Sequence, residues 1–424
     1  MKRIAPLAVL VCCACGGGLP GADSADNLSL QSKIKHLVVI VQENHSFDAY
    51  FGTWCQAPVG SEPSCTSGQG CCEAAPAQDP SGSDPVALTD RENGDYSPNH
   101  DQSCELPEMN GGAMDRYVTA SCGDKRNFAL AGDSDVPTYR EWASQYAIAD
   151  RYFQPVAGAS SSNDMYLATA RYMFLDNTYE PNSMGSGCSY NRDTIRYKST
   201  TIHDLLTAKK VDSSWYIEGY QAMADAWVCG WGAPDCTSSD YFPCIYDPSD
   251  IPAAYFKSTA DKPAFMRDYG QLATDLAAGT LPAVVFVKPL GFRSEHPGYG
   301  SGISEGVKFV SDTFAAIEGS QYASDTLVLV TWDESGGFFD HVTPPPDSTA
   351  DGQPYGPRVP LLALGPFARQ GSVSHVIMEH SSIVKFIEWN WLDGVGQLAA
   401  RDAVVNNIGS LLDPAATGVV VPAN

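Results

Sequence analysis

The chain has 424 residues, a hydrophobic fraction of 43% and a formal net charge of −24 at pH 7. This length and hydrophobic content suffice for one large α/β domain or two ordinary domains with a substantial core. The negative charge repels phosphate backbones and anionic lipid headgroups at long range, so we expect no nucleic-acid binding. An anionic small substrate would need a local positive element, such as a metal ion, to enter a site.

The N-terminus is typical of an exported protein. Lys2 and Arg3 precede an apolar run from Ile4 to Cys15, which is too short to span a bilayer but suits a secretory signal. Cys15 and the three glycines after it resemble a bacterial lipoprotein processing site. We expect residues 1–25 to form the signal and a lipoprotein tether, and residues 26–424 a single domain. The protein would be an outer-membrane or periplasmic lipoprotein, or secreted, and would touch a membrane only through a lipid anchor at Cys15.

Ten cysteines follow the signal in two groups of even number, which in an oxidising compartment favours disulfides that pin long loops. A zinc site is the alternative, but no histidine is interleaved with them at ligand spacing. Residues 53–98, rich in Gly, Pro, Ser and Asp, are expected to form a long insertion loop, and residues 222–248 a second one. The cysteines are Cys55, Cys65, Cys71, Cys72, Cys104, Cys122, Cys188, Cys229, Cys236 and Cys244.

Four short aliphatic runs predict strands, at residues 36–41, 282–287, 325–330 and 358–364. Each run is continuous rather than alternating, which favours strands buried on both faces of a largely parallel sheet. Helical patterns lie at residues 161–175, 306–320 and 381–392. The order of these elements indicates an α/β fold.

Polar groups stand just after three of these runs. Glu43 and Asn44 follow the first, residues 294–296 follow the second, and Asp333 and Glu334 follow the third. Because ligands of open α/β sheets bind beyond the carboxyl ends of strands, we expect one shared site. Adjacent acids are by default an exposed turn, but two buried carboxylates repel each other and a divalent cation relieves that repulsion. The apolar approach therefore favours a metal.

Ser160 and four histidines are candidates for further chemistry. Ser160 follows Gly158 and Ala159 and begins a helical pattern, where backbone N–H groups favour an anion. Helix capping by the serines at 160–162 is the alternative. A histidine is the natural proton donor to a leaving oxygen, and periodicity does not choose among the four. They are His100, His296, His341 and His380.

Six motifs together resemble a known family, the bacterial phosphoesterases that include non-haemolytic phospholipases C and secreted acid phosphatases. They occur in the family's order and span nearly the whole chain after the signal. The motifs are VVIVQENHSFDAYFG, NGGAMD, DRYFQPVAGASSSN, SEHP, TWDESGGFFDHVTPP and YGPRVPLLALGPFAR.

The resemblance implies an alkaline-phosphatase-like fold, with a central, mostly parallel sheet flanked by helices, and a metal-dependent hydrolase that forms a phosphoseryl intermediate. Ser160 would be the nucleophile and would also touch the metal, while His100 and His296 would lie around the phosphoryl group. Oxygen ligands favour Ca²⁺, Mg²⁺ or Mn²⁺ over Zn²⁺. The implied metal ligands are Glu43, Asn44, Ser160, Asp333 and Glu334, and Asn163, His341 and His380 would contact substrate or support the site.

The sequence departs from the family at Asp164, where an Arg is usual. The chain also stops soon after the last motif, whereas phospholipases C of the family commonly carry C-terminal β-rich domains. This favours an acid-phosphatase-like phosphomonoesterase. The alternatives are a phospholipase C type phosphodiesterase acting on phosphatidylcholine-like lipids, and a non-catalytic exported binding protein with the same fold, which Asp164 suggests.

Overall fold

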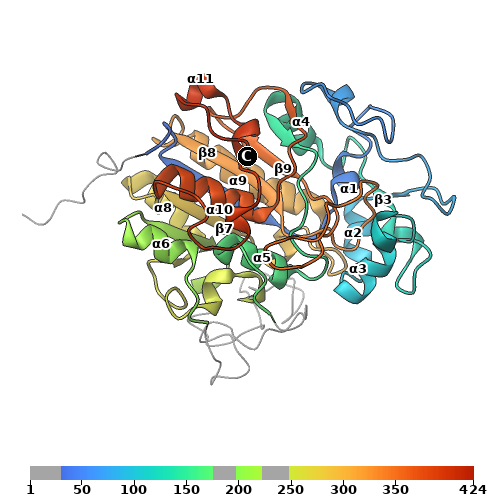
Figure 1. Cartoon of the computed structure of the whole chain (residues 1–424), viewed down its shortest axis with the longest axis horizontal. Coiled ribbons are helices and arrows are strands. Elements are labelled where there is room, and N and C mark those ends of the chain that lie inside the picture. Colours follow the sequence, from blue (N-terminus) through green and yellow to red (C-terminus); the bar gives the residue numbers. More distant parts are fainter. Residues whose placement is uncertain (1–29, 175–196, 222–247) are drawn as a thin grey trace, which may run out of the picture.

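The computed structural model describes residues 30–174, 197–221 and 248–424, and its main element is an eight-stranded sheet (Figure 1). The strand order is β10-β4-β9-β8-β1-β7-β5-β6. Only β9 runs antiparallel to its neighbours β4 and β8; the other pairs of this sheet, within the described residues, are parallel. Its strands are β1 (His36–Gln42), β4 (Ala147–Ala149), β5 (Ser213–Ile217), β6 (Met266–Asp268), β7 (Val284–Lys288), β8 (Thr326–Trp332), β9 (Leu361–Leu364) and β10 (Ser372–Ser374). The expected mostly parallel α/β sheet is confirmed.

The four aliphatic runs form the centre of this sheet. β1 lies between β8 and β7, with Val38 opposite Val328 on one side and Val285 on the other. Every residue of β1, β7, β8 and β9 is buried, which explains why the runs are continuous. The strands that sequence reasoning missed, β4, β5, β6 and β10, have only three to five residues each. Runs of that length carry little periodicity.

Helices surround the sheet (Figure 1). Helices α5, α6 and α10 contact one another, and α4 contacts α9. The three expected helices are present as α5, α9 and α10, although α5 ends earlier than predicted, where Ala170 takes a left-handed conformation. The α-helices are α1 (Phe47–Phe51), α2 (Asp90–Asp95), α3 (Gln102–Met109), α4 (Pro137–Gln145), α5 (Ser160–Thr169), α6 (Ile202–Ala208), α8 (Gly270–Ala278), α9 (Ile303–Glu318), α10 (His380–Trp391) and α11 (Pro414–Thr417).

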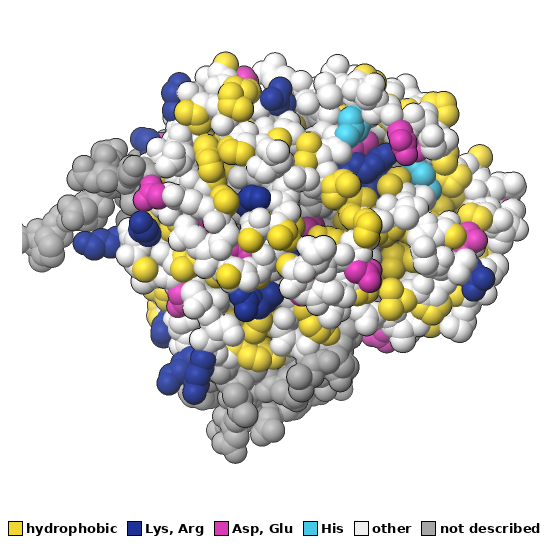
Figure 2. Space-filling view, in the orientation of Figure 1, with side chains coloured by type: hydrophobic (Ala, Val, Ile, Leu, Met, Phe, Trp, Pro, Cys, Tyr) yellow, Lys and Arg dark blue, Asp and Glu magenta, His cyan; other side chains and the backbone are white. Residues whose placement is uncertain are grey.

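Short segments complete the structure. A separate two-stranded sheet pairs β2 (Val86–Ala87) with β3 (Ala129–Leu130). The 3₁₀ turns are η2 (Gln69–Cys71), η3 (Asn110–Gly112), η4 (Lys125–Asn127), η5 (Pro248–Asp250), η6 (Pro252–Tyr255), η7 (Gly291–Arg293), η8 (Arg401–Ala403) and η9 (Ile408–Leu411). Among the described residues, none of the helices has the length and apolar character needed to cross a membrane. On the face shown in Figure 2, Lys and Arg side chains are scattered rather than gathered in one patch.

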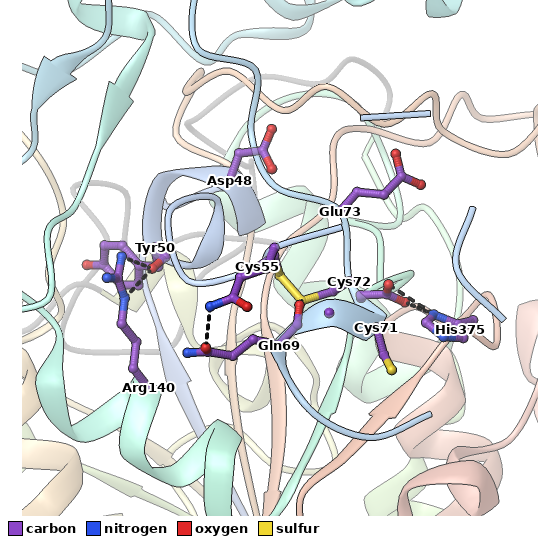
Figure 3. Close-up of a disulfide and its surroundings, with 12 residues drawn as sticks. Asp48, Tyr50, Cys55, Gln69, Cys71, Cys72, Glu73, Arg140 and His375 are labelled. Atoms are coloured by element: carbon purple, nitrogen blue, oxygen red, sulfur yellow. Dashed lines mark hydrogen bonds and ion pairs between the residues drawn. A yellow bond between two sulfur atoms is a disulfide. The ribbon is translucent and has the colours of Figure 1, made fainter. Parts of the chain in front are cut away.

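The first group of cysteines forms disulfides. The pairs are Cys55–Cys72, Cys65–Cys71 and Cys104–Cys122. Figure 3 shows the Cys55–Cys72 bond just beyond helix α1. The first two bonds confirm that cysteines staple the loop expected at residues 53–98, which also contains the short elements β2 and α2. The third bond lies after this segment. Because all six cysteines are paired, they do not form the alternative zinc site.

Other expectations lie outside the described residues. These are the signal and lipoprotein site at residues 1–25 with Cys15, nearly all of the second insertion, and the cysteines of the second group. Those cysteines are Cys188, Cys229, Cys236 and Cys244.

The core predicts a specific pH dependence of stability through His203 on α6. Its Nε2 accepts a hydrogen bond from Trp215 Nε1 at 3.0 Å, and its Nδ1 lies 2.7 Å from Ser213 Oγ. Burial lowers the pKa of His203 from 6.5 to about 4, so the unfolded chain takes up the proton first as the pH falls. The neutral His203 therefore contributes to the free energy of unfolding above pH 6.5. This contribution, roughly 3 kcal/mol, is lost as the pH falls to 4. In urea titrations between those pH values, His203→Gln should flatten the loss of unfolding free energy.

His375 provides the control, because its pKa is raised by its hydrogen bond to Asp150. The contribution of His375 is fully present below pH 6.5 and is lost as the pH rises through its raised folded pKa. His375→Gln should therefore lower the free energy of unfolding without changing its slope between pH 4 and 6.5. An equal slope in the parent and in His203→Gln would contradict the assignment to His203.

Candidate active site

Three neighbouring parallel strands deliver polar side chains to one edge of the sheet. Asp333 and Glu334 follow β8, Glu43 and Asn44 follow β1, and Lys288 is the last residue of β7. Each of the five is at most 2% exposed. The shared site expected from the sequence is therefore present at the carboxyl ends of β8, β1 and β7.

Ser160 reaches this edge from the first position of α5. Its Oγ lies 3.2 Å from Asn44 Oδ1 and 3.4 Å from Glu334 Oε1, and the side chain is almost fully buried. Ala159, which carries no capping group, occupies the N-cap position. The capping alternative therefore does not describe Ser160, because its hydroxyl is directed at the side chains that follow β1 and β8.

Asn163 fixes the loop before Ser160. Its Oδ1 accepts a hydrogen bond from Val156 N at 3.0 Å, and its Nδ2 donates to Gly158 O at 2.8 Å. The side chain thus spans the first turn of α5 and the preceding loop. Of its two expected roles, these contacts favour support of the site over contact with substrate.

Glu105 on α3 connects the Ser160 loop with the loop after β8. Its carboxylate accepts hydrogen bonds from Gly158 N at 2.6 Å and from Ser335 Oγ at 2.9 Å. Gln154 joins the same network, since its Nε2 donates to Glu105 and its Oε1 accepts from Ser335 N. Burial raises the pKa of Glu105 to about 8. Sequence reasoning missed Glu105, although it adjoins Cys104, whose disulfide to Cys122 holds the same helix.

His100 and His296 lie together, as the sequence expectation placed them, with ring centroids 5.7 Å apart. Their Nδ1 atoms lie 3.0 Å from Pro98 O and 2.8 Å from Pro297 O, respectively. A carbonyl only accepts, so each Nδ1 carries the proton and each Nε2 is the nitrogen that can exchange one with a ligand. His100 Nε2 is 3.8 Å from Glu334 Oε1. Burial lowers the pKa of both rings, and that of His296 falls well below its usual value.

Glu295 holds the segment that carries His296. Its carboxylate accepts hydrogen bonds from Tyr139 Oη at 2.5 Å, Tyr50 Oη at 2.6 Å and Trp332 Nε1 at 3.0 Å. Burial raises its pKa to about 7. These donors come from α4, α1 and β8, so the SEHP motif is bound into the core by its acid while its histidine reaches the site.

His380 contacts the backbone of a site residue and a core tyrosine. Its Nε2 lies 2.7 Å from Asp333 O, and its Nδ1 lies 2.7 Å from Tyr152 Oη. Since the ring nitrogen next to Asp333 O must be the donor, Nδ1 accepts from the tyrosine. His380 therefore fixes the backbone at Asp333, which fits the supporting role expected for it.

His341 belongs to a different cluster, formed with Asp48 and Asp340. One ligand atom of each lies within 4.8 Å of the others, so the group could hold a metal ion. However, Arg358 Nη2 lies 2.9 Å from Asp48 Oδ1, and its Nε lies 2.8 Å from Asp340 Oδ1. His341 Nδ1 is 2.7 Å from Asp48 Oδ2. Burial lowers the pKa of His341, but the charge of Asp48 and its hydrogen bond outweigh burial, so the net shift is a rise. Because Arg358 and His341 already balance these acids, we interpret this cluster as structural.

The residues near Ser160 fit a divalent ion better. The oxygens of Asn44, Ser160 and Glu334 converge, and Asp333 Oδ2 has no hydrogen-bond partner among the described residues. Burial and the neighbouring Asp333 raise the pKa of Glu334 well above its usual range. Buried oxygen donors of this kind suit a hard ion such as Ca²⁺, Mg²⁺ or Mn²⁺.

Lys288 is a component that sequence reasoning missed. Its Nζ lies 2.9 Å from Glu43 Oε1, 3.5 Å from Asp164 Oδ2 and 3.8 Å from Asp333 Oδ2. Glu43 Oε2 accepts a further hydrogen bond from Ser294 Oγ at 3.1 Å. The available signal was a lysine that ends the buried run PAVVFVK, directly before the expected site segment.

The chain is similar to several known proteins. The Phosphoesterase family model matches residues 34–392. The non-hemolytic phospholipase C of Pseudomonas aeruginosa is 26% identical over 408 residues, covering 84% of this chain and 53% of that protein. Phospholipase C B of Mycobacterium tuberculosis is 25% identical over 434 residues, covering 90% of this chain and 78% of that protein. The chain thus spans about half the length of the Pseudomonas relative.

Solved structures give a distant likeness. A protein in the alkaline phosphatase superfamily from Vibrio parahaemolyticus is 11% identical, with a TM-score of 0.39. The match covers 85% of this chain and 67% of that one.

Gly336 generates a prediction about the geometry of the site. Its φ is +68°, and a Cβ there would lie 2.2 Å from Asn44 O, on the backbone that positions the Asn44 amide. Gly336→Ala should therefore lower the free energy of unfolding by on the order of 3 kcal/mol and displace Asn44. Chemical unfolding and divalent-metal affinity measure the two effects.

Gly352 is the matched control. Its φ is +71°, but nothing lies within 4 Å of a Cβ there. Gly352→Ala should lower the free energy of unfolding by only about 1 kcal/mol, because an alanine is strained in the left-handed backbone conformation. It should leave metal affinity unchanged. Equal losses in the two variants would show that the contact with Asn44 is unimportant.

Proposed function

The chain belongs to the Phosphoesterase family, and from this premise we propose that it hydrolyses phosphoric esters with Ser160 as nucleophile and a divalent metal ion as cofactor. The observation that carries the proposal is the position of Ser160 Oγ. It stands at the N-terminus of α5, within 3.4 Å of Asn44 Oδ1 and Glu334 Oε1. A helix N-terminus favours both an alkoxide and a phosphate group.

Each side chain of the site has a role in this reaction. Asn44, Asp333 and Glu334 would hold the ion with Ser160, and Glu43 would complete the set from beside Lys288. When bound, the ion neutralises phosphoryl charge and favours the serine alkoxide. As Ser160 Oγ attacks phosphorus, its hydroxyl proton passes to the bare Nε2 of His100 or His296. The same Nε2 then donates this proton to the departing oxygen. Water cleaves the phosphoserine, and a proton from this water returns to Ser160 Oγ.

The class of ester has two candidates. One is a phosphomonoester, as in the secreted acid phosphatases that the sequence motifs also resemble. The similar proteins from Pseudomonas and Mycobacterium are both named phospholipases C, and this favours a phosphodiester such as a phosphatidylcholine-like lipid. A non-catalytic binding protein is less well supported, because Ser160 and the oxygen donors around it are all present at the sheet edge.

Export is part of the proposal. Three disulfides among the described residues suit an oxidising compartment. We propose an exported single-domain protein, with Cys15 as the site of a lipid anchor if the tether is processed.

Removing the nucleophile should abolish turnover without removing the ion. We expect Ser160→Ala to lose roughly a thousand-fold or more in hydrolysis of phosphate esters, while Mn²⁺ binding persists through the carboxylates. Ser162→Ala is the control, since the buried Ser162 Oγ on the same helix has no hydrogen-bond partner among the described residues. Equal activity of Ser160→Ala and the parent would remove Ser160 from the mechanism.

Substrate class is decided by two chromogenic esters, p-nitrophenyl phosphate and p-nitrophenyl phosphorylcholine, compared by kcat/KM. Preferential turnover of the first would identify a phosphomonoesterase, and of the second a phospholipase C type enzyme. Turnover of neither, at saturating Mn²⁺, Mg²⁺ and Ca²⁺, would refute hydrolysis of both classes and favour the binding-protein alternative.

The location of the ion is tested by metal analysis. Asp333→Asn and Glu334→Gln should each reduce both the bound divalent ion and the activity, and a chelator should abolish the activity reversibly. His341→Gln, in the cluster balanced by Arg358, should retain the ion. Loss of metal from His341→Gln, with full occupancy in the other two variants, would show that the ion binds at the His341 cluster and not near Ser160.

A further inference from the structure

A buried asparagine connects the stapled segment at residues 53–98 with the chain around His296. Asn93 is the fourth residue of α2 and is fully buried. Its Nδ2 donates to Glu295 O at 2.9 Å and to Ser301 O at 3.0 Å. An amide nitrogen has two hydrogens to donate, so both are used here. One side chain thus holds the backbone before and after His296.

The backbone of α2 binds the same stretch, residues 295–301, which we call the His296 loop. Gly298 N donates to Asn93 O at 2.6 Å, and Gly300 N donates to Gly94 O at 3.0 Å. Together with the amide of Asn93, these bonds attach the His296 loop to two consecutive residues of α2. The loop is therefore fixed at several points along its length by a single helix.

The chain after α2 packs closely on the His296 loop and leads to the other histidine of the site. A Cβ on Gly298 would lie only 2.6 Å from Ser97 Cβ. His100 follows three residues later, and its ring centroid is 5.7 Å from that of His296. The end of the stapled segment thus contacts the loop of one histidine and continues directly to the other.

The turn at Glu295 depends on such support. Its φ is +71°, a left-handed conformation that is unfavourable for a residue with a side chain. Asn93 Nδ2 binds the carbonyl oxygen of this residue, and His296 is the next residue of the chain. The amide therefore acts at the turn that determines where His296 points.

The oxygen of the same amide is held by the core. Asn93 Oδ1 lies 2.9 Å from His45 Nε2, in the segment that follows β1. The His45 ring stacks on Tyr50 and on Phe338, with centroids 4.5 and 5.1 Å apart. Because these rings are buried, Asn93 connects the His296 loop with a rigid part of the sheet edge.

We propose that Asn93 is a positioning residue for His296, and that the stapled segment completes the active site in this way. The inference rests on the proposed function and deepens it by naming the side chain that keeps His296 in place for proton transfer. Asn93 acts on the placement of His296 Nε2 relative to the ester. A displacement of about 1 Å at a reacting group can lower a rate roughly a hundred-fold.

The first test compares Asn93→Ala with Asn127→Ala in hydrolysis of the p-nitrophenyl ester that the parent prefers, at saturating Mn²⁺. Asn127 is the matched control, since it is fully buried and its Nδ2 donates to Glu108 Oε1 and Tyr117 O, both at 3.0 Å. Asn93→Ala should lower kcat about a hundred-fold and leave Mn²⁺ affinity close to the parental value. Asn127→Ala should keep the parental kcat per folded molecule. Equal kcat values in the two variants would overturn the inference.

A double-mutant cycle tests whether Asn93 acts through His296. His296→Ala alone should lower kcat at least as much as Asn93→Ala does. Adding Asn93→Ala to His296→Ala should then cause no further loss, because the side chain that it positions is already absent. Losses that multiply in the double variant would show that Asn93 acts by another route, and would overturn the inference.

Gly94→Ala tests the same contact in a protein that keeps the Asn93 amide, and so covers the case in which Asn93→Ala does not fold. A Cβ there would lie 3.2 Å from Gly300 Cα, so the His296 loop must shift by a few tenths of an ångström. This variant should lower kcat several-fold, with no such effect in the His296→Ala background. Gly70→Ala, in the same stapled segment, is the control, because nothing lies within 4 Å of a Cβ there. Equal kcat values in the two glycine variants would overturn the inference.

The outcomes separate this inference from the proposed function. Turnover by the parent that is lost in Ser160→Ala but unchanged in Asn93→Ala would overturn the inference and leave the function standing. A parental kcat in His296→Ala would do the same, and would assign proton transfer to His100. No turnover of either p-nitrophenyl ester by the parent would overturn both.

Discussion

The burial of several carboxylates at one edge of the sheet is the constraint on which the rest of the site depends. Glu43, Asp164, Asp333 and Glu334 are each at most 2% exposed, in a chain of net charge −24. Buried anions without cations are strongly unfavourable. Lys288 contacts three of these acids, and His100 Nε2 lies 3.8 Å from Glu334 Oε1. A divalent ion at this edge would balance charge that these two side chains leave uncompensated, in keeping with the metal dependence that is typical of the family.

In the cluster of Asp48, Asp340 and His341, basic side chains of the protein itself balance the buried acids. There Arg358 contacts both Asp48 and Asp340, and His341 contacts Asp48, so two basic side chains face two acids. A guanidinium has a fixed planar fork that fills the space between two carboxylates. Proximity of acidic and histidine ligand atoms alone would favour the Asp48 cluster as a metal site, whereas the balance of charge favours the acids near Ser160. On this distinction we interpret His341 as part of the framework and place the proposed catalysis at the residues around Ser160.

Much of the fold and of the site could be predicted because the signals are local. The runs that became β1, β7 and β8 are continuous, and the acids at 43, 333 and 334 follow them directly. Glu105 and Gln154 gave no such signal, because their importance lies in hydrogen bonds between distant loops. The short strands β4 and β10 were missed since three residues in a strand are specified by tertiary packing rather than by periodicity.

The interpretation of Asp164, which stands where the family usually has an Arg, changes once its contacts with the neighbouring strand are known. In the sequence, an acid in place of an arginine beside the nucleophile suggested loss of catalysis. In the structure, its carboxylate lies 3.5 Å from Lys288 Nζ, and the same ammonium contacts Glu43 and Asp333. In this chain a positive charge reaches the site from the end of β7, where Lys288 contacts all three acids. A change of sign at one position is therefore compatible with an intact site, because the electrostatics depend on the sum of charges around the carboxylates and not on which element carries each one.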